Sequence, residues 1–430
     1  MNCELMHPAD QIVLIMNRIY TQGLTTTSGG NLSICDGSGN VWITPSGVDK
    51  GSLTRGDICL IKPDGSLSGP HKPSVELPFH LSVYNARPDI KAILHAHPPM
   101  LISFSIARVV PAVNLTASSW RICGKTAMAP YAVPGSAELS DAISGEFAKG
   151  FDIVLLEKHG VVIGAEDLSA AFMKFETFES AAKTEICARR LGKPIGLNEP
   201  DLSRSLSAGY LAQGEFKPDL QSEAESCARS EMVDFIQRAY RQKLITSTQG
   251  TFSYRLDGNT FLITPDGPDR ACIDAGDLVL IRSGMTEHGK TSSRFTLLHQ
   301  AVYELNPDIR SIICANPPHA MAFSVTDEPF DPRIIPESYN ILRESGKIPF
   351  ADIYERIDAV AARLSNRSPV LLCRNNTIIS TGDSMLRAFD RLEITEATAR
   401  SIINAKAISE IVLISDSEIA EVARAFNLFE

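Results

Sequence analysis

The residues of this chain best suited to chemistry are two histidines in residues 90–99, which read I-K-A-I-L-H-A-H-P-P. Alternate side chains of a β-strand share a face, so His95 and His97 would point the same way and could bind one metal ion. Pro98 and Pro99 would end the strand and leave both imidazoles at its exposed end. The alternative is a strand end that carries two histidines and no ligand.

Two more side chains could complete a metal site. His159 falls in the turn of a predicted β-hairpin, residues 153–164, where it is well placed to be a third ligand. Glu76 falls in the first turn of a predicted helix over residues 73–87, with Ser74 as the N-cap. A carboxylate suits the start of a helix on electrostatic grounds alone. Glu76 is therefore either a partner of the helix dipole or a carboxylate delivered beside the histidine strand.

Two turns rich in hydroxyl groups and glycine precede this helix. Residues 25–33 read T-T-T-S-G-G-N-L-S, and the second turn contains Thr44, Ser46 and Gly47. Free backbone N–H groups at such turns can form an anion-binding nest. Together the turns could hold one phosphate or carboxylate, although ordinary turns between regular elements have the same composition.

The elements that must position these residues alternate between helix and strand patterns. Helices are predicted over residues 8–22, 137–147 and 168–191, and a further strand over residues 103–114. Strands surrounded by helices, with hairpins and short crossovers, predict a layered α/β sheet.

Length and composition limit the class of protein. The chain has 430 residues, which predicts two domains, and its net charge of −10 with no basic run argues against a nucleic-acid partner. Nine scattered cysteines favour reduced thiols in a cytoplasmic protein. Charged residues interrupt the first 20 positions, and no apolar run could span a membrane, so neither a signal peptide nor a membrane partner is expected.

The order of these motifs resembles the class II aldolase/adducin family, that of fuculose-phosphate aldolase and ribulose-phosphate 4-epimerase. S-G-G-N-L-S, T-P-S-G, a glutamate four residues before a histidine, H-A-H-P and K-H-G follow one another in residues 8–195. The resemblance implies a three-layer α/β/α fold and a divalent ion bound by His95, His97 and His159. It also implies that Glu76 is both the catalytic acid/base and a ligand in the resting site. A phosphate pocket is implied at Gly30, Asn31, Ser46, Gly47 and Ser74.

The ligand set suits Zn²⁺ best, with Mn²⁺, Co²⁺ or Ni²⁺ as alternatives. One position departs from the pattern of many phosphate-using members. Those members have two serines before the glutamate, and this chain has Val75 in place of the second. The lost hydroxyl weakens the case for a phosphorylated substrate.

The second half repeats the pattern of the first without its site. Residues 244–253 match residues 24–33, and residues 299–309 match residues 80–90. We therefore expect a catalytic domain over residues 1–195, a linker over residues 196–224 and a degenerate copy over residues 225–430. The four site positions change to Cys314, Asn316, Asn376 and Phe295, or Arg294 if the alignment shifts by one. Gly30 is kept as Gly250, while Asn31 becomes Thr251 and Ser46 becomes Asp266.

These features predict a metal-dependent aldolase or lyase of carbohydrate metabolism acting on a small hydroxy-carbonyl compound, sugar phosphates included. The bound ion would stabilise an enediolate, and Glu76 would move the proton if its pocket raises its pKa. Decarboxylation of a small oxo or aromatic acid is the second enzyme hypothesis, and a non-catalytic adducin-like scaffold is the third. Single-domain members are commonly four-fold tetramers, so a homodimer of this chain could form the same ring of four domains. Tyr339 is then a candidate proton donor to a first-half site.

Overall fold

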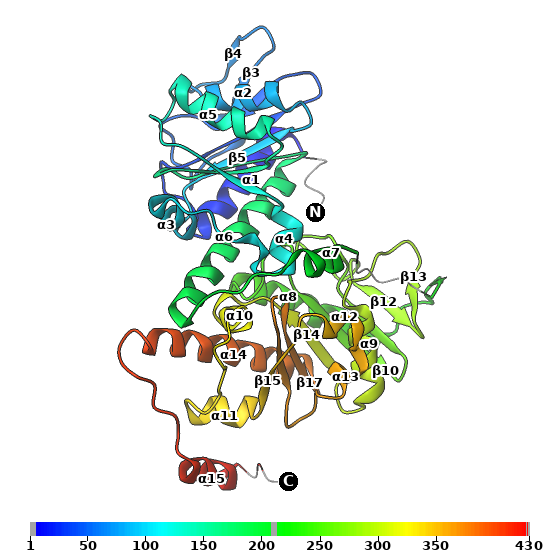
Figure 1. Cartoon of the computed structure of the whole chain (residues 1–430). Helices are drawn as coiled ribbons and strands as arrows, with labels where there is room; N and C mark the ends of the chain where they lie inside the picture. Colours follow the sequence, from blue (N-terminus) through cyan, green and yellow to red (C-terminus); the bar gives the residue numbers. More distant parts are fainter. Residues whose placement is uncertain (1–5, 208–212, 427, 429–430) are drawn as a thin grey trace. The chain divides into compact units, whose positions relative to one another are not determined.

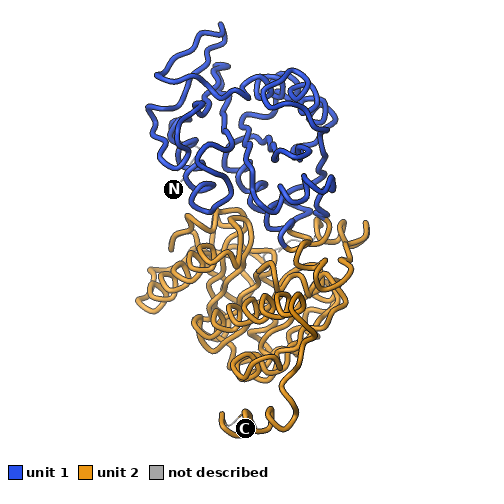
Figure 2. Tube along the Cα trace, turned by 90° about the vertical axis from the view of Figure 1, so that its left-hand side faces the viewer, with its two compact units in different colours: residues 1–113, 119–183 blue, residues 114–118, 184–430 orange. Residues whose placement is uncertain are grey.

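The computed structural model describes residues 6–207, 213–426 and 428. The chain divides into two compact units, residues 1–113 with 119–183 and residues 114–118 with 184–430 (Figure 2). Each unit contains one large mixed sheet with helices on both faces (Figure 1). The duplicated three-layer α/β/α fold is confirmed.

The first unit is built on an eight-stranded sheet of order β4-β3-β2-β1-β5-β8-β7-β6. Its strands are β1 (Asn31–Cys35), β2 (Val41–Ile43), β3 (Cys59–Ile61), β4 (Leu67–Ser68), β5 (Ala92–Ala96), β6 (Thr126–Ala129), β7 (Ile153–Leu156) and β8 (Val161–Ala165). Its helices are α1 (Pro8–Thr21), η2 (Arg55–Asp57), α2 (Leu77–Ala86), α3 (Pro99–Ala107) and α5 (Ala137–Ala148). The division between units falls within η3 (Val113–Leu115), α4 (Ala117–Cys123) and α6 (Leu168–Leu191).

Burial of apolar side chains on both faces of the sheet holds the first unit together. On one face α2 and α5 supply Phe79, Val83, Ile143 and Phe147 to a core shared with Ile93 and other strand residues. α1 packs against β1 and β2, and its Arg18 stacks 4.2 Å from the ring centroid of Phe172 in α6. The central strand β5 is buried along its whole length.

The second unit has the same strand order with one strand added, β15-β16-β17-β14-β10-β11-β12-β13-β9. Its strands are β9 (Glu215–Phe216), β10 (Thr251–Asp257), β11 (Thr260–Ile263), β12 (Val279–Arg282), β13 (Met285–Glu287), β14 (Ser311–Ala315), β15 (Ser345–Ile348), β16 (Val370–Cys373) and β17 (Thr377–Gly382). Its longer helices are α7 (Glu199–Ser207), α8 (Glu223–Arg241), α9 (Thr296–Leu305), α14 (Met385–Ala405) and α15 (Asp416–Ala425). Shorter helices are α10 (Pro318–Ser324), α11 (Pro336–Leu342), α12 (Asp352–Glu355) and α13 (Ile357–Ala361). The shared order confirms the tandem duplication.

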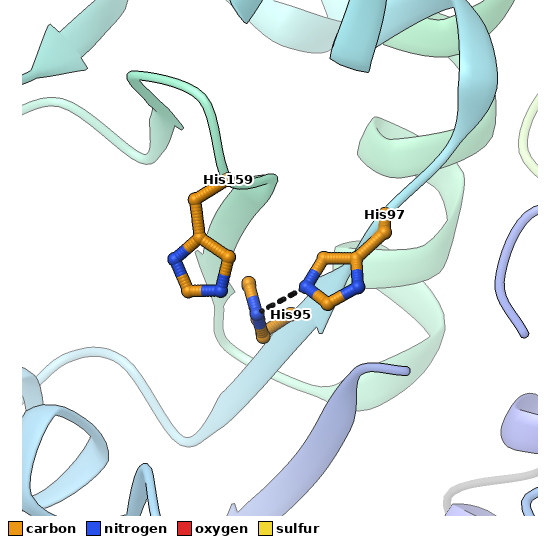
Figure 3. A group of neighbouring side chains, drawn as sticks. All are labelled: His95, His97 and His159. Carbon is orange, nitrogen blue, oxygen red and sulfur yellow. Dashed lines mark hydrogen bonds between the residues drawn. The ribbon is translucent and has the colours of Figure 1, made fainter. Parts of the chain in front are cut away.

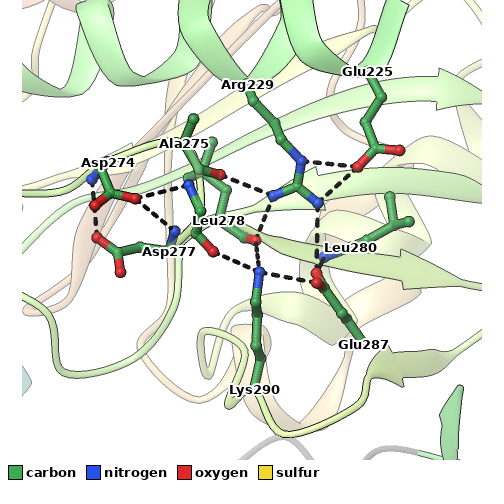
Figure 4. A network of polar contacts seen from close by, with 10 residues as sticks. Glu225, Arg229, Asp274, Ala275, Asp277, Leu278, Leu280, Glu287 and Lys290 are labelled. Carbon is green, nitrogen blue, oxygen red and sulfur yellow. Dashed lines mark hydrogen bonds and ion pairs between the residues drawn. The ribbon is translucent and has the colours of Figure 1, made fainter. Parts of the chain in front are cut away.

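A buried arginine ties α8 to the sheet of the second unit (Figure 4). The Arg229 guanidinium pairs with Glu225 at 2.7 Å and donates to the Leu278 carbonyl at 2.6 Å. It also lies 3.5 Å from Glu287, which in turn pairs with Lys290 at 3.0 Å. Because every charge in this network has an opposite partner, its burial does not leave an isolated ion.

Two expectations about the elements are wrong. Residues 103–114 do not form a strand, because α3 begins at Pro99 and ends with Arg108 in the left-handed conformation. Proline favours the first position of a helix, where its missing N–H has no partner to lose. Glu76, rather than Ser74, is the N-cap residue of α2, and the Ser74 hydroxyl accepts from the Glu76 N–H at 3.3 Å.

No helix in the described ranges is both long enough and apolar enough to cross a bilayer.

Candidate metal centre

Three histidines of the first unit converge on one point (Figure 3). His95 lies near the end of β5, His97 follows that strand, and His159 lies in the turn between β7 and β8. Their candidate ligand nitrogens all lie within 4.8 Å of one another. The Nε2 atoms of His95 and His97 are 3.0 Å apart, and His95 is fully buried.

The sheet and the hairpin turn set the positions of these rings. His95 pairs with Asn31 of β1 and Val162 of β8, and the Val161 carbonyl accepts a hydrogen bond from His95 Nδ1 at 3.0 Å. Nε2 is therefore the nitrogen left for a ligand. In the turn, Lys158 adopts a left-handed φ of 56°, and the Ser105 hydroxyl of α3 accepts from the His159 N–H at 3.1 Å.

Glu76 faces the histidines from the start of α2. Its Oε2 lies 3.2 Å from His95 Nε2 and accepts from the Asn31 amide at 2.8 Å. Its Oε1 lies 3.4 Å from His159 Nε2 and has no hydrogen-bond partner among the described residues, although it is buried. One carboxylate oxygen is thus held, and the other is available to a ligand.

Electrostatics keep two of the imidazoles neutral. Burial and the neighbouring His95 lower the pKa of His97 to about 3 and that of His159 to about 4. Burial would lower the pKa of His95, but the adjacent Glu76 carboxylate raises it overall. Burial would raise the pKa of Glu76, and His95 and His159 outweigh this and lower it. The condition that the pocket raises the pKa of Glu76 is therefore not met, and its carboxylate is ionised.

This set of donors fits a divalent metal ion. Neutral imidazole and carboxylate are ligands that Zn²⁺ and similar ions bind in proteins. A cation would interact with polar atoms that face one another here. These atoms are the two imidazole nitrogens 3.0 Å apart and the buried Glu76 Oε1, which has no hydrogen-bond partner among the described residues. His95, His97 and His159 would hold the ion, with Glu76 as a fourth ligand.

The residues expected to bind the substrate lie on turns or, for Asn31, at the start of β1. A β-bridge between Pro45 and Pro73 brings the turn of Ser46 and Gly47 beside Ser74, and Gly47 has a φ of 71°. Gly30 packs so closely that an added Cβ would lie 2.6 Å from the His95 carbonyl. Asn31 directs its amide at Glu76. Tyr339 lies in α11 of the second unit, partly exposed.

Sequence reasoning missed a buried polar chain behind the carboxylate. His80 of α2 is fully buried and contacts Asn31, while Ser33 and Tyr84 lie behind it. A histidine four residues after Glu76 was visible in the sequence only as part of the family pattern.

The corresponding region of the second unit is filled by its own side chains. Phe295 is the N-cap residue of α9, as Glu76 is of α2, and it packs against the apolar core. The Asn316 amide donates to the Asn376 carbonyl, and the Asn376 amide donates to the Tyr354 hydroxyl at 2.8 Å. Burial raises the pKa of Cys314. In the described part of the chain, the three histidines of the first unit are the one group of three or more His, Cys, Asp or Glu side chains close enough to hold a metal ion.

Comparisons with known proteins agree with the two-copy arrangement. The sequence model of one protein family, described as the class II aldolase and adducin N-terminal domain, matches residues 10–186 and again residues 230–403. A 5-deoxy-D-ribulose 1-phosphate aldolase of Bacillus thuringiensis is 32% identical over 46% of this chain and 93% of its own length. A 3-oxo-tetronate 4-phosphate decarboxylase of Haemophilus influenzae is 32% identical over 40% of this chain and 83% of its own length. A solved L-fuculose 1-phosphate aldolase is 31% identical, covering 46% of this chain and 93% of its own, with a TM-score of 0.42.

Proposed function

The chain belongs to the class II aldolase and adducin family and is a lyase of that family, and from this premise we propose that its first unit cleaves a small hydroxy-carbonyl compound. The observation that carries the proposal is the convergence of three imidazoles and one carboxylate at the end of β5. We take residues 1–195 as the catalytic domain, residues 196–224 as a linker and residues 225–430 as the degenerate copy.

Each residue of the site has a separate proposed role. His95, His97 and His159 hold a divalent ion, for which Zn²⁺ is our first choice, ahead of Mn²⁺, Co²⁺ and Ni²⁺. When bound, such an ion supplies a Lewis acid that polarises a carbonyl group. Glu76 takes and returns the proton at its Oε1 atom, the carboxylate oxygen for which the described residues supply no hydrogen bond. Asn31 holds the other oxygen in place.

The turns next to the site are proposed to bind an anionic group of the substrate. Gly30, Asn31, Ser46, Gly47 and Ser74 supply backbone N–H groups, hydroxyls and an amide, which suit phosphate. The aldolase and decarboxylase relatives both carry a phosphorylated substrate in their names. We therefore favour a sugar phosphate, even with Val75 in place of a second serine.

Decarboxylation is the second candidate function. Aldolase and decarboxylase relatives are equally similar to the chain, at 32% identity. Both reactions need a stabilised carbanion next to a carbonyl group, so the ligand set does not select between them. A non-catalytic scaffold is disfavoured because such a protein has no use for three converging imidazoles.

A screen of sugar phosphates and β-keto acids tests the proposal. The zinc-loaded protein should turn over one of these classes, and Glu76→Gln should lower kcat by about 10²–10⁴-fold because it removes the proton acceptor. Phe295→Leu, at the matching position of the second unit, should leave kcat unchanged. Turnover that survives Glu76→Gln would exclude Glu76 as the base, and no turnover of any compound would reject the proposed function.

We also propose that the chain acts in the cytoplasm as a homodimer whose four domains form a ring. None of the eight described cysteines is in a disulfide, in agreement with a reducing compartment. In this ring Tyr339 donates a proton to a first-unit site. Sedimentation should give a dimer, and Tyr339→Phe should lower kcat without changing the dimer mass. A monomer, or an unchanged kcat in Tyr339→Phe, would remove this part of the proposal.

A further inference from the structure

A continuous chain of hydrogen bonds runs through the first unit and ends on Glu76. The Tyr84 hydroxyl lies 2.7 Å from Ser33 Oγ, which lies 2.6 Å from His80 Nδ1. His80 Nε2 lies 2.5 Å from Asn31 Oδ1, and Asn31 Nδ2 lies 2.8 Å from Glu76 Oε2. All five side chains are buried.

The chemistry of the groups gives this chain one direction. A carboxylate only accepts hydrogen bonds, so the Asn31 amide must present its NH₂ group to Glu76 and its oxygen to His80. His80 therefore donates from Nε2. Burial lowers the pKa of His80 to about 3, so its ring is neutral and Nδ1 accepts from the Ser33 hydroxyl. Ser33 in turn accepts from Tyr84, and every donor points toward Glu76.

The second unit contains the tyrosine, serine and histidine of this hydrogen-bonded series but not the asparagine and the glutamate. Ser253 lies 2.7 Å from His299 Nδ1 and 2.6 Å from the Tyr303 hydroxyl, as in the first unit. There His299 Nε2 faces Cys314 Sγ at 3.3 Å, and Thr251 replaces the asparagine. The serine, histidine and tyrosine thus serve the fold in both units, whereas the link to a carboxylate exists only beside the three histidines.

We propose that His80 is a positioning residue, which fixes the Asn31 amide and through it holds Glu76 Oε2, so that Oε1 faces the metal and the substrate. The proposal rests on the proposed function for the role of Glu76. It assigns His80 no contact with the substrate and no proton transfer. Without the imidazole, the amide can rotate and the carboxylate loses the hydrogen bond that it accepts from Asn31.

The effect of His80 must therefore pass through Glu76, and a double-variant cycle tests this. Zinc affinity is measured by competition with a chelator for wild type, His80→Phe, Glu76→Gln and the double variant. Removal of residues that orient metal ligands typically costs about 10–100-fold in affinity. We expect such a loss in both single variants, with no further loss in the double variant. Unchanged affinity in His80→Phe, or losses that multiply in the double variant, would overturn the proposal.

His299→Phe is the matched control, because it removes the same buried ring and the same contact with a serine hydroxyl in the second unit, where no asparagine links the ring to a carboxylate. It should lower Tm by a similar amount and leave zinc affinity unchanged. An equal loss of zinc affinity in His299→Phe would show a general effect of destabilisation and would contradict the proposal. Should His80→Phe fail to fold, Ser33→Ala and its counterpart Ser253→Ala give the same comparison by removing one hydroxyl each.

Activity gives a second readout that separates this inference from the proposed function. With a substrate identified by the screen, His80→Phe should lower kcat about tenfold or more with little change in KM, and His80→Gln should restore most of it, since its amide can donate to Asn31. A loss confined to KM, or no rescue by glutamine, would contradict positioning of Glu76. If no substrate is found, the proposed function fails while the zinc cycle still decides the role of His80.

Discussion

At the scale of residues, the two units differ at all four candidate ligand positions of the first. Glu76, His95, His97 and His159 correspond to Phe295, Cys314, Asn316 and Asn376 in the same strands, turn and helix start. The apolar frame around these positions accepts either set. The frame therefore does not require the histidines, which is the strongest reason to assign them a chemical role.

Gly160 gives a prediction at this scale, because it follows His159 where no side chain fits. A Cβ there would lie 2.6 Å from the Ala96 carbonyl oxygen and 2.6 Å from His97 Cδ2. Gly160→Ala must displace the turn or His97, so we expect zinc affinity to fall by about tenfold or more in a chelator competition. Gly145→Ala in α5, where nothing lies within 4 Å, is the control.

The Gly145→Ala control should stabilise the fold. Replacing a helical glycine by alanine should raise the unfolding free energy by about 0.5–1 kcal/mol and leave zinc affinity unchanged. Equal zinc affinities in Gly160→Ala and wild type would mean that the ring of His97 is not held by this close contact.

At this scale the sequence predicted the group of candidate ligands, because their types and spacing carry the signal, and the three imidazoles do lie together. It did not identify His80, since a single buried histidine in an apolar helix has no pattern of its own. It also could not show whether the condition of a raised Glu76 pKa is met. Burial acts as expected, but the distances to His95 and His159 decide the balance, and no sequence pattern contains those distances.

At the scale of elements, regular patterns were predictive and apolar segments were not. The helix expected over residues 168–191 is α6, and the hairpin expected over residues 153–164 is β7 and β8. The segment after Pro99 is apolar and small throughout, so it has neither a helical nor a strand period to separate the two. Packing decides there, and α3 places Ser105 against the turn of His159.

The start of α10 gives a prediction about pH. His319 pairs with Glu396 at 2.6 Å, and Glu396 also accepts from the N–H groups of His319 and Ala320. Burial lowers the pKa of His319, but hydrogen bonds with Cys187 and Glu396 raise it overall to about 9. The pKa of His319 is thus higher in the folded chain than the value of 6.5 taken for the unfolded chain. The protonated imidazole therefore stabilises the folded state fully below pH 6.5, and this contribution is lost as the pH rises through about 9.

We therefore expect the unfolding free energy to decline by at most about 3 kcal/mol across that window. His319→Met is the matched control, because the first unit has Met100 in this position with Glu179 accepting from its N–H at 3.0 Å. The variant should lose the decline measured by chemical denaturation at each pH. A decline of the same size in His319→Met would assign it to other groups.

At the scale of the whole molecule, one fold occurs twice and one copy carries the site. Both sheets share eight strands in one order, and each family match spans most of a unit. The second copy retains its core, and Phe295 and Tyr354 lie in the region that matches the candidate site of the first, so we expect no second catalytic centre there. The number of metal ions per chain separates these two possibilities.

Elemental analysis of the purified, metal-replete chain is the most direct test of this account. We predict about one divalent ion per chain. His97→Asn, which gives the first unit the residue of the second, should bring the ratio close to zero without unfolding the chain. A ratio near two would place a second metal site in the second unit. No bound metal in the wild-type chain would contradict the assignment of His95, His97 and His159 as ligands.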